Sequence, residues 1–321
     1  MKNILITSAG KRVTLVKQFQ KELKELFPTA KVYTTEMNPS LSPAAVISDG
    51  CFQVRSVVSE GYIHELLQIC IDNLVKIIIP TIDTELELLS QNKKIFCDSG
   101  IEIIVSDLSF IKMCRDKRNT GQFLMQNNIR VPKSIDKYNP TFPLFAKPYD
   151  GSLSKDLFFI NSPLELTENI LDHPKLIFME YIDKNEYKEF TVDMYYGRDN
   201  HVKGIVPRER LEIRAGEINK GLTRKNYLVE FIKERLEYIP GVIGCICIQL
   251  FYKEKDNDVV GIEINPRFGG GYPLSYAAKA NFPANIILEY MCGKPIDYSD
   301  SWLDNTLMLR YDSDIIVYDE K

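Results

Sequence analysis

Residues 261–271 hold the most informative side chains of this 321-residue chain. A short apolar strand carries Glu263 and Asn265 two positions apart, and because side chains alternate along a strand, both groups lie on one face. Pro266 ends the strand, and Arg267 and three glycines follow. Mg²⁺ takes oxygen ligands and commonly shares them with substrate phosphates. The segment therefore predicts a metal-holding strand of a nucleotide-dependent enzyme, the alternative being a solvated strand face.

Two lysines add positive charge that suits a phosphate. Lys117 opens a predicted helix, and Lys147 ends a predicted apolar strand, where a buried ammonium is unfavourable unless it meets an anion. The turn 150–155 that follows contains Gly151, Ser152 and Ser154, whose backbone N–H groups are suited to a phosphate. The alternatives are a surface role for Lys147 and a contact made by another basic residue in place of Lys117, namely Lys112 or Arg115.

Three further groups complete the candidate site. An apolar strand ending at Glu180, Tyr181 and Ile182 is suited to offer backbone groups to an adenine, and a later carboxylate is suited to a ribose. Gln249 lies on the strand that a tight turn joins to the strand of Glu263, so we expect the two side chains to be neighbours. The third group is a set of closely spaced arginines, Arg208, Arg210 and Arg214, whose guanidinium groups suit a carboxylate or a phosphate.

These arginines follow a predicted strand, and Arg208 and Arg210 share a face if that strand continues. We expect them to face an acceptor substrate or a γ-phosphate, the alternative being a solvated loop. The basic run continues with Lys220, Arg224 and Lys225, which we expect on a mobile loop.

The elements that position these groups begin with a β/α alternation in the first third of the chain. Apolar strands separated by helices indicate a parallel sheet covered on both faces, so residues 1–108 are expected to form a Rossmann-like domain. Ligands of such sheets bind at the carboxyl ends of the strands, here 7–10, 36–38 and 81–84. Residues 8–10 are either a ligand-binding loop or a plain strand-to-helix turn. The expected strands are 3–7, 31–36, 76–80 and 102–105, and the expected helices are 11–26, 62–74 and 84–91.

The remainder reads as a mixture of helices and antiparallel strands. Two hairpins are expected, one around the turn 197–200 and one around the turn 253–258. The expected strands are 144–147, 156–160, 176–181, 189–196, 201–206, 242–252, 259–264 and 307–318, and the expected helices are 116–126, 163–171, 227–238 and 284–291.

The order of Lys117, Lys147, the 150–155 turn, the strand at 179–182 and the pair Gln249/Glu263 resembles the ATP-grasp superfamily, and within it the carbamoyl-phosphate-synthase-like branch. The run Glu263-x-Asn265-Pro266-Arg267 with a preceding glutamine carries most of this resemblance. It covers nearly the whole chain and implies an α/β fold: a Rossmann-like domain (1–108), an ATP-grasp small, lid-like subdomain (109–185) and a large C-terminal subdomain (186–321).

The resemblance also implies the role of each residue. Phosphate contacts fall to the two lysines, adenine contacts to residues 180–182, and ribose binding to Glu189, with Glu186 a poorer match. The implied ligands of Mg²⁺ or Mn²⁺ are Gln249, Glu263 and Asn265. Arg267, with Arg208 and Arg210, is expected at the transferred phosphate.

The implied reaction transfers the γ-phosphoryl group of ATP to a carboxylate, and an amine or another nucleophile then displaces phosphate from the acyl phosphate. This chemistry requires positioning and charge neutralisation, and needs no catalytic Ser, Cys or His. The alternatives are a carbamoyl phosphate synthase-like fragment that acts with a partner chain and a non-catalytic nucleotide sensor. Two departures from the family pattern are the single glycine of the phosphate-covering turn and Gln249, where an acidic ligand is more usual.

Composition restricts the partners. A net charge of −4 gives no bulk electrostatic case for nucleic acid or an anionic membrane, and no run of 18 apolar residues indicates a spanning helix. Seven scattered cysteines are typical of a reducing cytoplasm, and the pair Cys245 and Cys247 is expected to pack in the core. The absence of G-x-G-x-x-G before residue 108 argues against a dinucleotide cofactor. We expect a cytoplasmic protein with small carboxylate and amine substrates, and a homodimer is an open possibility.

Overall fold

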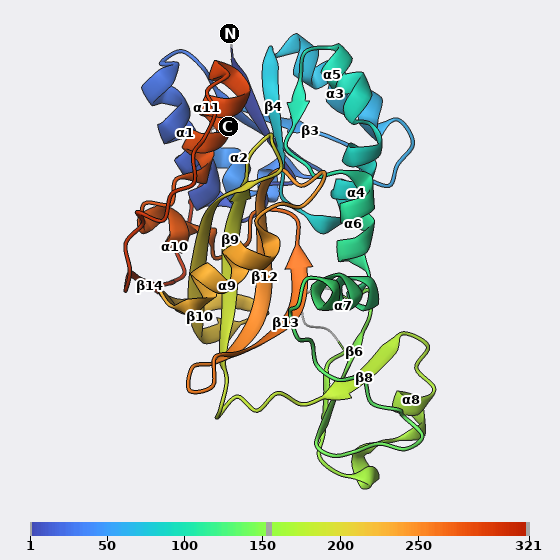
Figure 1. The fold of residues 1–321 in the computed structure, drawn as a ribbon. Helices are drawn as coiled ribbons and strands as arrows, with labels where there is room; N and C mark the ends of the chain where they lie inside the picture. Colours follow the sequence, from blue (N-terminus) through green and yellow to red (C-terminus); the bar gives the residue numbers. More distant parts are fainter. Residues whose placement is uncertain (1, 152–155, 319–321) are drawn as a thin grey trace.

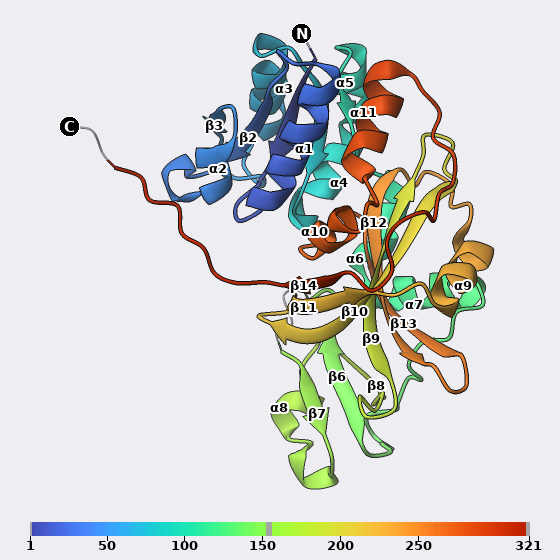
Figure 2. The ribbon, with the colours of Figure 1, turned by 90° about the vertical axis from the view of Figure 1, so that its left-hand side faces the viewer.

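The computed structural model describes residues 2–151 and 156–318, which form three β-sheets (Figure 1). The five-stranded sheet of the N-terminal part lies at one end of the molecule and the three-stranded sheet at the other, with the six-stranded sheet between them (Figures 1 and 2). The two larger sheets therefore adjoin, and the three-stranded sheet projects away from them.

The N-terminal sheet is parallel, with strand order β3-β2-β1-β4-β5. Its central strands β1 and β4 are almost wholly buried, as their apolar runs 4–6 and 77–79 predict for a sheet covered on both faces. The strands are β1 (Asn3–Thr7), β2 (Val32–Glu36), β3 (Cys51–Gln53), β4 (Val75–Pro80) and β5 (Glu102–Ile103). The helices are α1 (Val13–Leu26), the 3₁₀ turn η1 (Pro39–Leu41), α2 (Pro43–Ile47), α3 (Tyr62–Asp72), α4 (Asp83–Gln91) and α5 (Lys93–Asp98).

Two helices lead from this sheet to the small antiparallel sheet, whose order is β7-β6-β8. The second of them, α7, packs against β13 so closely that a methyl group at Gly261 would lie 2.8 Å from Leu124. The elements are α6 (Leu108–Arg115), α7 (Lys117–Gln126), β6 (Leu144–Pro148), β7 (Phe158–Ile160), η2 (Pro163–Glu165), α8 (Glu168–Leu171) and β8 (Leu176–Glu180).

The six-stranded sheet is antiparallel, in the order β13-β12-β9-β10-β11-β14. Its strands are β9 (Lys188–Tyr196), β10 (Val202–Arg214), β11 (Glu217–Thr223), β12 (Gly244–Lys253), β13 (Asp258–Asn265) and β14 (Leu307–Leu309), and its helices are α9 (Tyr227–Leu236), α10 (Tyr272–Ala277) and α11 (Phe282–Cys292). Cys245 and Cys247 are buried in β12, as expected.

One hydrophobic core joins the N-terminal sheet to the C-terminal helices. It contains Phe19 of α1 and Phe268 of the glycine-rich loop, whose rings meet edge to face with centroids 5.8 Å apart. Helix α1 also lies against α11 (Figure 2). The N-terminal sheet is therefore packed directly on the segment that follows the predicted metal-holding strand.

Several sequence-based expectations for the elements are wrong. The segment expected to be a mobile basic loop begins with a strand, because Lys220 lies within β11, and Arg224 pairs with Glu209. The helix expected at 163–171 is divided into η2 and α8, and the strand expected at 307–318 ends at Leu309. Elements α2, β3, α5, α6 and α10 were not expected, and none of them is longer than eight residues.

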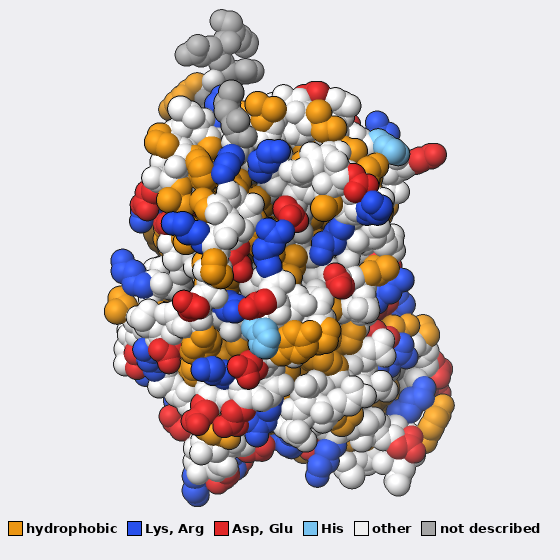
Figure 3. Space-filling model, turned by 45° about the horizontal axis from the view of Figure 1, so that its top comes forward, with side chains coloured by type: hydrophobic (Ala, Val, Ile, Leu, Met, Phe, Trp, Pro, Cys, Tyr) orange, Lys and Arg blue, Asp and Glu red, His pale blue; other side chains and the backbone are white. Residues whose placement is uncertain are grey.

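The visible surface carries lysine, arginine and acidic side chains interspersed with hydrophobic ones (Figure 3). Within residues 2–151 and 156–318, no helix is long and apolar enough to cross a membrane.

Candidate active site

The predicted metal-holding strand has the expected geometry. Glu263 and Asn265 lie on one face of β13, and Asn265 Nδ2 donates to Glu263 Oε1 at 3.1 Å. Gln249 of β12 is the direct cross-strand neighbour of Glu263. With its amide nitrogen turned toward Glu263, Gln249 donates to Glu263 Oε1 at 3.3 Å. The hairpin therefore brings together all three side chains that the sequence nominates for a metal.

This group contains a single carboxylate. In the part of the chain that the structure describes, no three His, Cys, Asp or Glu side chains gather in a metal-binding arrangement. Two neutral amides and one carboxylate suit Mg²⁺ only where phosphates supply further oxygen ligands and negative charge.

The two predicted lysines converge on the same carboxylate from outside the hairpin. Lys117, the first residue of α7, lies with its Nζ 3.7 Å from Glu263 Oε2 and donates to the carbonyl oxygen of Gly151 at 2.6 Å. Lys147, in β6, is only 7% exposed. Burial lowers the pKa of Lys147 to about 8, although the Glu263 carboxylate opposes this change, and the Lys117 ammonium adds to it. Lys117 thus pairs with the Glu263 carboxylate, and the buried Lys147 ammonium has no ion-pair partner within 4.0 Å among the described residues, an arrangement that favours a further anion.

A second branch of contacts leads from Gln249 to the residue proposed for ribose. In the orientation given above, Gln249 accepts from Arg210 Nη1 at 3.1 Å, and Arg210 Nη1 also donates to Glu189 Oε1 at 2.5 Å. Arg210 Nε is buried without a hydrogen-bond partner among the described residues. Side chains from α7, β9, β10, β12 and β13 therefore form one connected polar network.

Arg267 lies next to this network but is bound to the N-terminal part. Its guanidinium donates to both oxygens of Asp83, at 2.9 and 2.7 Å, and Nη2 lies 3.4 Å from Asn265 Oδ1. Burial alone would lower the pKa of Arg267, but the Asp83 carboxylate raises it. Asp83 begins α4 at the carboxyl end of β4, one of the strand ends that the sequence singles out.

The three arginines of the 208–214 segment lie in different surroundings. Arg208 is 1% exposed and makes a two-pronged pair with Asp193 at 2.7 and 2.8 Å, while Ser275 Oγ also donates to Asp193. Arg214 is exposed and pairs with Asp312. Of these three arginines, only Arg210 is hydrogen-bonded to another residue of the predicted site, Glu189. The three therefore do not form the one substrate-facing cluster that we expected.

The residues predicted to bind adenine have other partners. Glu180 is held by Arg130 at 2.5 Å, the Tyr181 ring packs on Phe159 with centroids 4.4 Å apart, and Ile182 is buried. Ser152 and Ser154 lie outside the described residues, and Glu186 pairs with Lys253. The nucleotide-binding roles of these residues remain predictions.

Sequence reasoning missed the acidic partners of the arginines. Asp83 is distant in the sequence from its partner Arg267, and Asp193 is not a local neighbour of its partner Arg208. No residue spacing therefore predicts either ion pair. A buried carboxylate, Glu85, was also missed; it accepts from Thr7, from Ser8 at 2.9 Å and from Tyr62 at 3.3 Å. The only available signal was the position of Asp83 and Glu85 just after a buried strand.

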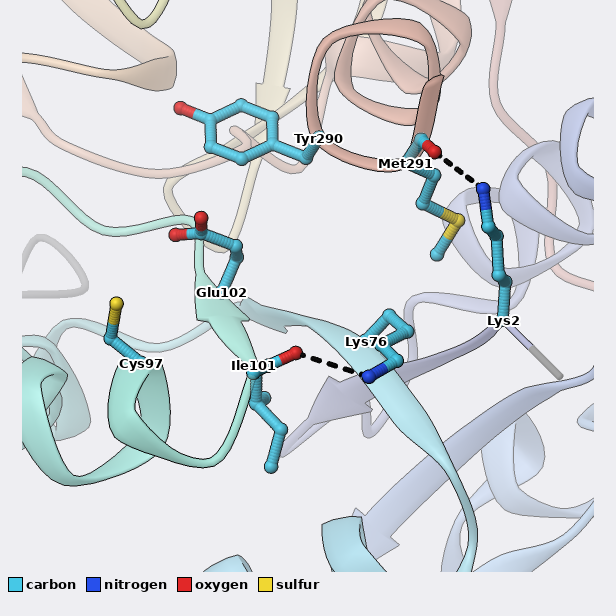
Figure 4. A pocket seen from close by; sticks show the side chains of 8 residues that line it. Lys2, Lys76, Cys97, Ile101, Glu102, Tyr290 and Met291 are labelled. Atoms are coloured by element: carbon cyan, nitrogen blue, oxygen red, sulfur yellow. Dashed lines mark hydrogen bonds between the residues drawn. The ribbon is translucent and has the colours of Figure 1, made fainter. Parts of the chain in front are cut away.

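A cavity of about 200 Å³ lies elsewhere, near the start of β1 and beside α11 (Figure 4). Lys2 and Lys76 point toward it, and their ammonium groups donate to the carbonyl oxygens of Met291 and Gly100, at 2.5 and 3.4 Å. None of the predicted site residues lines this cavity. We therefore assign the candidate site to the network around Glu263.

Comparisons with known proteins agree with this fold. A family model described as "PylC-like, N-terminal domain" matches residues 4–104, and one described as "ATP-grasp in the biosynthetic pathway with Ter operon" matches residues 172–305. No curated protein matches the sequence.

Solved structures are similar over nearly the whole chain. N5-carboxyaminoimidazole synthetase from Staphylococcus aureus, complexed with ADP, is 18% identical, with a TM-score of 0.70 over 96% of this chain and 79% of that one. Biotin carboxylase from Campylobacter jejuni is 14% identical, with a TM-score of 0.71 over 94% of this chain and 73% of that one. L-amino acid ligase from Bacillus licheniformis is 18% identical, with a TM-score of 0.67 over 92% of this chain and 75% of that one.

The chain has an ATP-grasp fold, and the ATP-grasp family model matches part of its C-terminal half. Its N-terminal part is similar to that of PylC-like proteins. The comparisons do not single out the carbamoyl-phosphate-synthase-like branch.

Proposed function

We propose that this protein is an ATP- and Mg²⁺-dependent ligase that activates a carboxylate as an acyl phosphate and joins it to an amine or another nucleophile. The carrying observation is the convergence of Lys117, Lys147 and the Gln249–Glu263–Asn265 group on one point. Cations opposite a set of oxygen ligands suit a metal-bound polyphosphate. The ATP-grasp fold supports the proposal, as do the complexes of similar proteins with ADP and with an ATP analogue.

The residues present fit a magnesium ion that arrives with its nucleotide. Glu263 would hold the ion through its carboxylate, with Gln249 and Asn265 as neutral oxygen ligands, and the phosphates would complete the coordination. The bound ion would supply charge neutralisation at the transferred phosphoryl group. Mn²⁺ fits the same oxygen ligands.

The proposed reaction has two chemical steps, and the protein side chains bind and neutralise the reacting groups. A carboxylate oxygen of the substrate attacks the γ-phosphorus, the bond to the β-phosphate oxygen breaks, and ADP leaves. The amine nitrogen then attacks the acyl carbon, loses a proton, and inorganic phosphate leaves. Lys117 and Lys147 would neutralise the phosphate oxygens, and Arg267, which lies beside Asn265, would bind the acyl phosphate.

Phosphate release tests this function directly. The chain is incubated with Mg·ATP and pairwise mixtures of amino acids and other carboxylates and amines, and phosphate is measured. Glu263→Gln removes the single carboxylate of the group. We expect it to reduce turnover by at least about 100-fold, which is the loss typical of removing one charged contact to the transition state. Glu254→Gln, at an exposed carboxylate of the same hairpin, is the matched control and should retain activity. Unchanged turnover in Glu263→Gln would contradict the metal role.

Two other functions remain distinguishable. A nucleotide sensor would bind ATP tightly and release no phosphate with any acceptor. A carbamoyl phosphate synthase-like subunit would form a stable complex with a glutaminase-like chain on co-purification, and full activity of the isolated chain would exclude it.

A further inference from the structure

The two amides proposed as metal ligands present their nitrogen atoms to Glu263. Asn265 Nδ2 donates to Glu263 Oε1 at 3.1 Å, and Gln249, in the orientation given above, donates to the same oxygen at 3.3 Å. An amide nitrogen is a hydrogen-bond donor, and only the amide oxygen has lone pairs suited to a cation. Within this group of three side chains, Glu263 is therefore the one that offers oxygen atoms to a metal.

Two arginines hold the amide oxygens. The oxygen of Gln249 accepts from Arg210 Nη1 at 3.1 Å. The oxygen of Asn265 lies 3.4 Å from Arg267 Nη2. The reverse orientation of Gln249 would direct its oxygen at the Glu263 carboxylate and its nitrogen at the Arg210 guanidinium, so both contacts would be repulsive. The charges on either side of Gln249 thus determine which way its amide faces.

Arg210 is held firmly in this position. Its side chain is 5% exposed, Nη1 donates to Glu189 Oε1 at 2.5 Å, and Nη2 donates to the carbonyl oxygen of Gly216 at 2.8 Å. A guanidinium that is fixed by a carboxylate and a backbone carbonyl does not move away from Gln249 without losing both of these contacts. For Gln249 to give its oxygen to a metal, its own amide must therefore turn and lose two hydrogen bonds.

The amide of Asn265 is held less tightly. Arg267 donates to both oxygens of Asp83, at 2.9 and 2.7 Å, and its contact with Asn265 is longer, at 3.4 Å. A hydrogen bond of this length is weak, so we expect the Asn265 amide to turn readily. The contact between Arg210 and Gln249 is therefore the one that most restricts the group of candidate metal ligands.

We propose that Arg210 is a positioning residue that keeps the Gln249 oxygen turned away from Glu263 until a nucleotide binds. This inference rests on the proposed ligase function. Without nucleotide, turning the amide loses two hydrogen bonds and gains one neutral ligand for a cation that Glu263 alone holds weakly. Phosphate oxygens bring negative charge and further ligands to the cation, so the gain of an amide oxygen then outweighs the loss. The complete set of protein ligands would thus form only with the nucleotide.

The experiment measures what Gln249 contributes to metal affinity with and without Arg210. Binding of Mn²⁺ is followed by the electron paramagnetic resonance signal of the free ion, first with Mn²⁺ alone and then with ADP added. Gln249→Ala is introduced into the wild type, Arg210→Met and Arg224→Met. Arg224 is the matched control, because its guanidinium also pairs with a glutamate of β10, Glu209, and does not bind Gln249. Loss of Mn²⁺ binding in Glu263→Gln shows that the ion occupies this site.

Without nucleotide, Gln249→Ala is expected to leave the Mn²⁺ affinity of the wild type and of Arg224→Met nearly unchanged. In Arg210→Met, where the amide oxygen is free to turn, Gln249→Ala should weaken Mn²⁺ binding about 10-fold, the factor expected for one polar contact. With ADP present, Gln249→Ala should weaken Mn²⁺ binding by about the same factor in the wild type as well, because the amide has then turned.

Arg210→Lys, which keeps a positive charge beside Glu189 and loses the fork, repeats the comparison in a second variant and should give the same result. A merely structural role of Arg210 would lower the melting temperature and leave Gln249→Ala without effect in every nucleotide-free background, which would overturn the inference. An equal loss in all these backgrounds would also overturn it, since the oxygen would then bind the metal despite Arg210. Either result together with phosphate release leaves the ligase function in place. A wild type that neither binds ADP with Mn²⁺ nor releases phosphate would overturn the proposed function, and this inference with it.

Discussion

Replacing Lys147 with methionine should stabilise the protein in the absence of nucleotide and metal. The ammonium group is buried and is repelled by a second cation, Lys117, which itself pairs with the Glu263 carboxylate. Methionine has a similar length and no charge to desolvate. The substitution should therefore remove an unfavourable term from the free energy of the folded state and, at the same time, the proposed phosphate contact.

The size of the effect follows from the pKa of Lys147. The fall from 10.5 to about 8 corresponds to about 3 kcal/mol, at 1.36 kcal/mol per pH unit. Because the folded state binds this proton less tightly than the unfolded state, the penalty is complete below pH 8. It is relieved as the pH rises from about 8 to 10.5. The advantage of Lys147→Met should thus reach about 3 kcal/mol at pH 7 and vanish near pH 10.5.

The assay is urea unfolding of both proteins in EDTA at several pH values between 7 and 10. Mg·ATP is then added at pH 7, where it should stabilise the wild type much more than the variant, because bound ligand adds stability according to its affinity. Lys279→Met, at an exposed lysine, is the control for loss of charge alone. A variant less stable than the wild type at pH 7, or a difference that does not change with pH, would refute the reasoning.

Two further predictions concern the packing around the buried Arg208 and the ionisation of the buried Glu85. Gly271→Ala should destabilise the fold by about 2–4 kcal/mol in urea unfolding, because its methyl group would overlap with Arg208 and Ile218. Gly121→Ala, where a methyl group meets nothing within 4 Å in helix α7, should be neutral or stabilising, and equal effects of the two would contradict this explanation. Burial raises the pKa of Glu85 to about 6, so wild-type stability should fall by up to about 2 kcal/mol as pH rises from 4.5 through 6. Glu85→Gln should remove that fall in thermal or urea unfolding; an unchanged pH profile would show that Glu85 does not cause it.

Local geometry was predictable wherever one strand or one hairpin determines it. The two-residue spacing of Glu263 and Asn265 predicted a common face, and the short turn predicted that Gln249 lies beside Glu263; both are confirmed by contacts. Alternation and turn length fix such relations regardless of the rest of the fold. The approach of Lys117 and Lys147 to Glu263 was different, because it followed from the resemblance to a family and from no spacing in the chain.

The arginines show a limit of what the sequence alone predicts. Arg208 and Arg210 are two positions apart on a strand, yet one is buried against Asp193 and the other joins Gln249 and Glu189. A change of register follows Arg210 in the pairing with β11, and the partner strand itself was read as a loop. Without knowledge of the neighbouring strands, the acidic partner of an arginine cannot be read from its spacing.

The pair Arg267–Asp83 connects the two ends of the site physically. Asp83 begins a helix on the N-terminal sheet, and Arg267 follows the strand of the candidate metal ligands, so their two hydrogen bonds cross the junction between these parts. Both side chains are only partly exposed, at 16% and 26%, which reduces solvent screening and makes the loss of either partner unfavourable for the other. Arg267 also lies beside Asn265, with Nη2 3.4 Å from Asn265 Oδ1, so one guanidinium contacts both the N-terminal part and the group of candidate metal ligands. The packing of the N-terminal sheet against the C-terminal part therefore determines the position of Arg267. In the proposed reaction, it would thereby determine the geometry in which an acyl phosphate and its nucleophile meet.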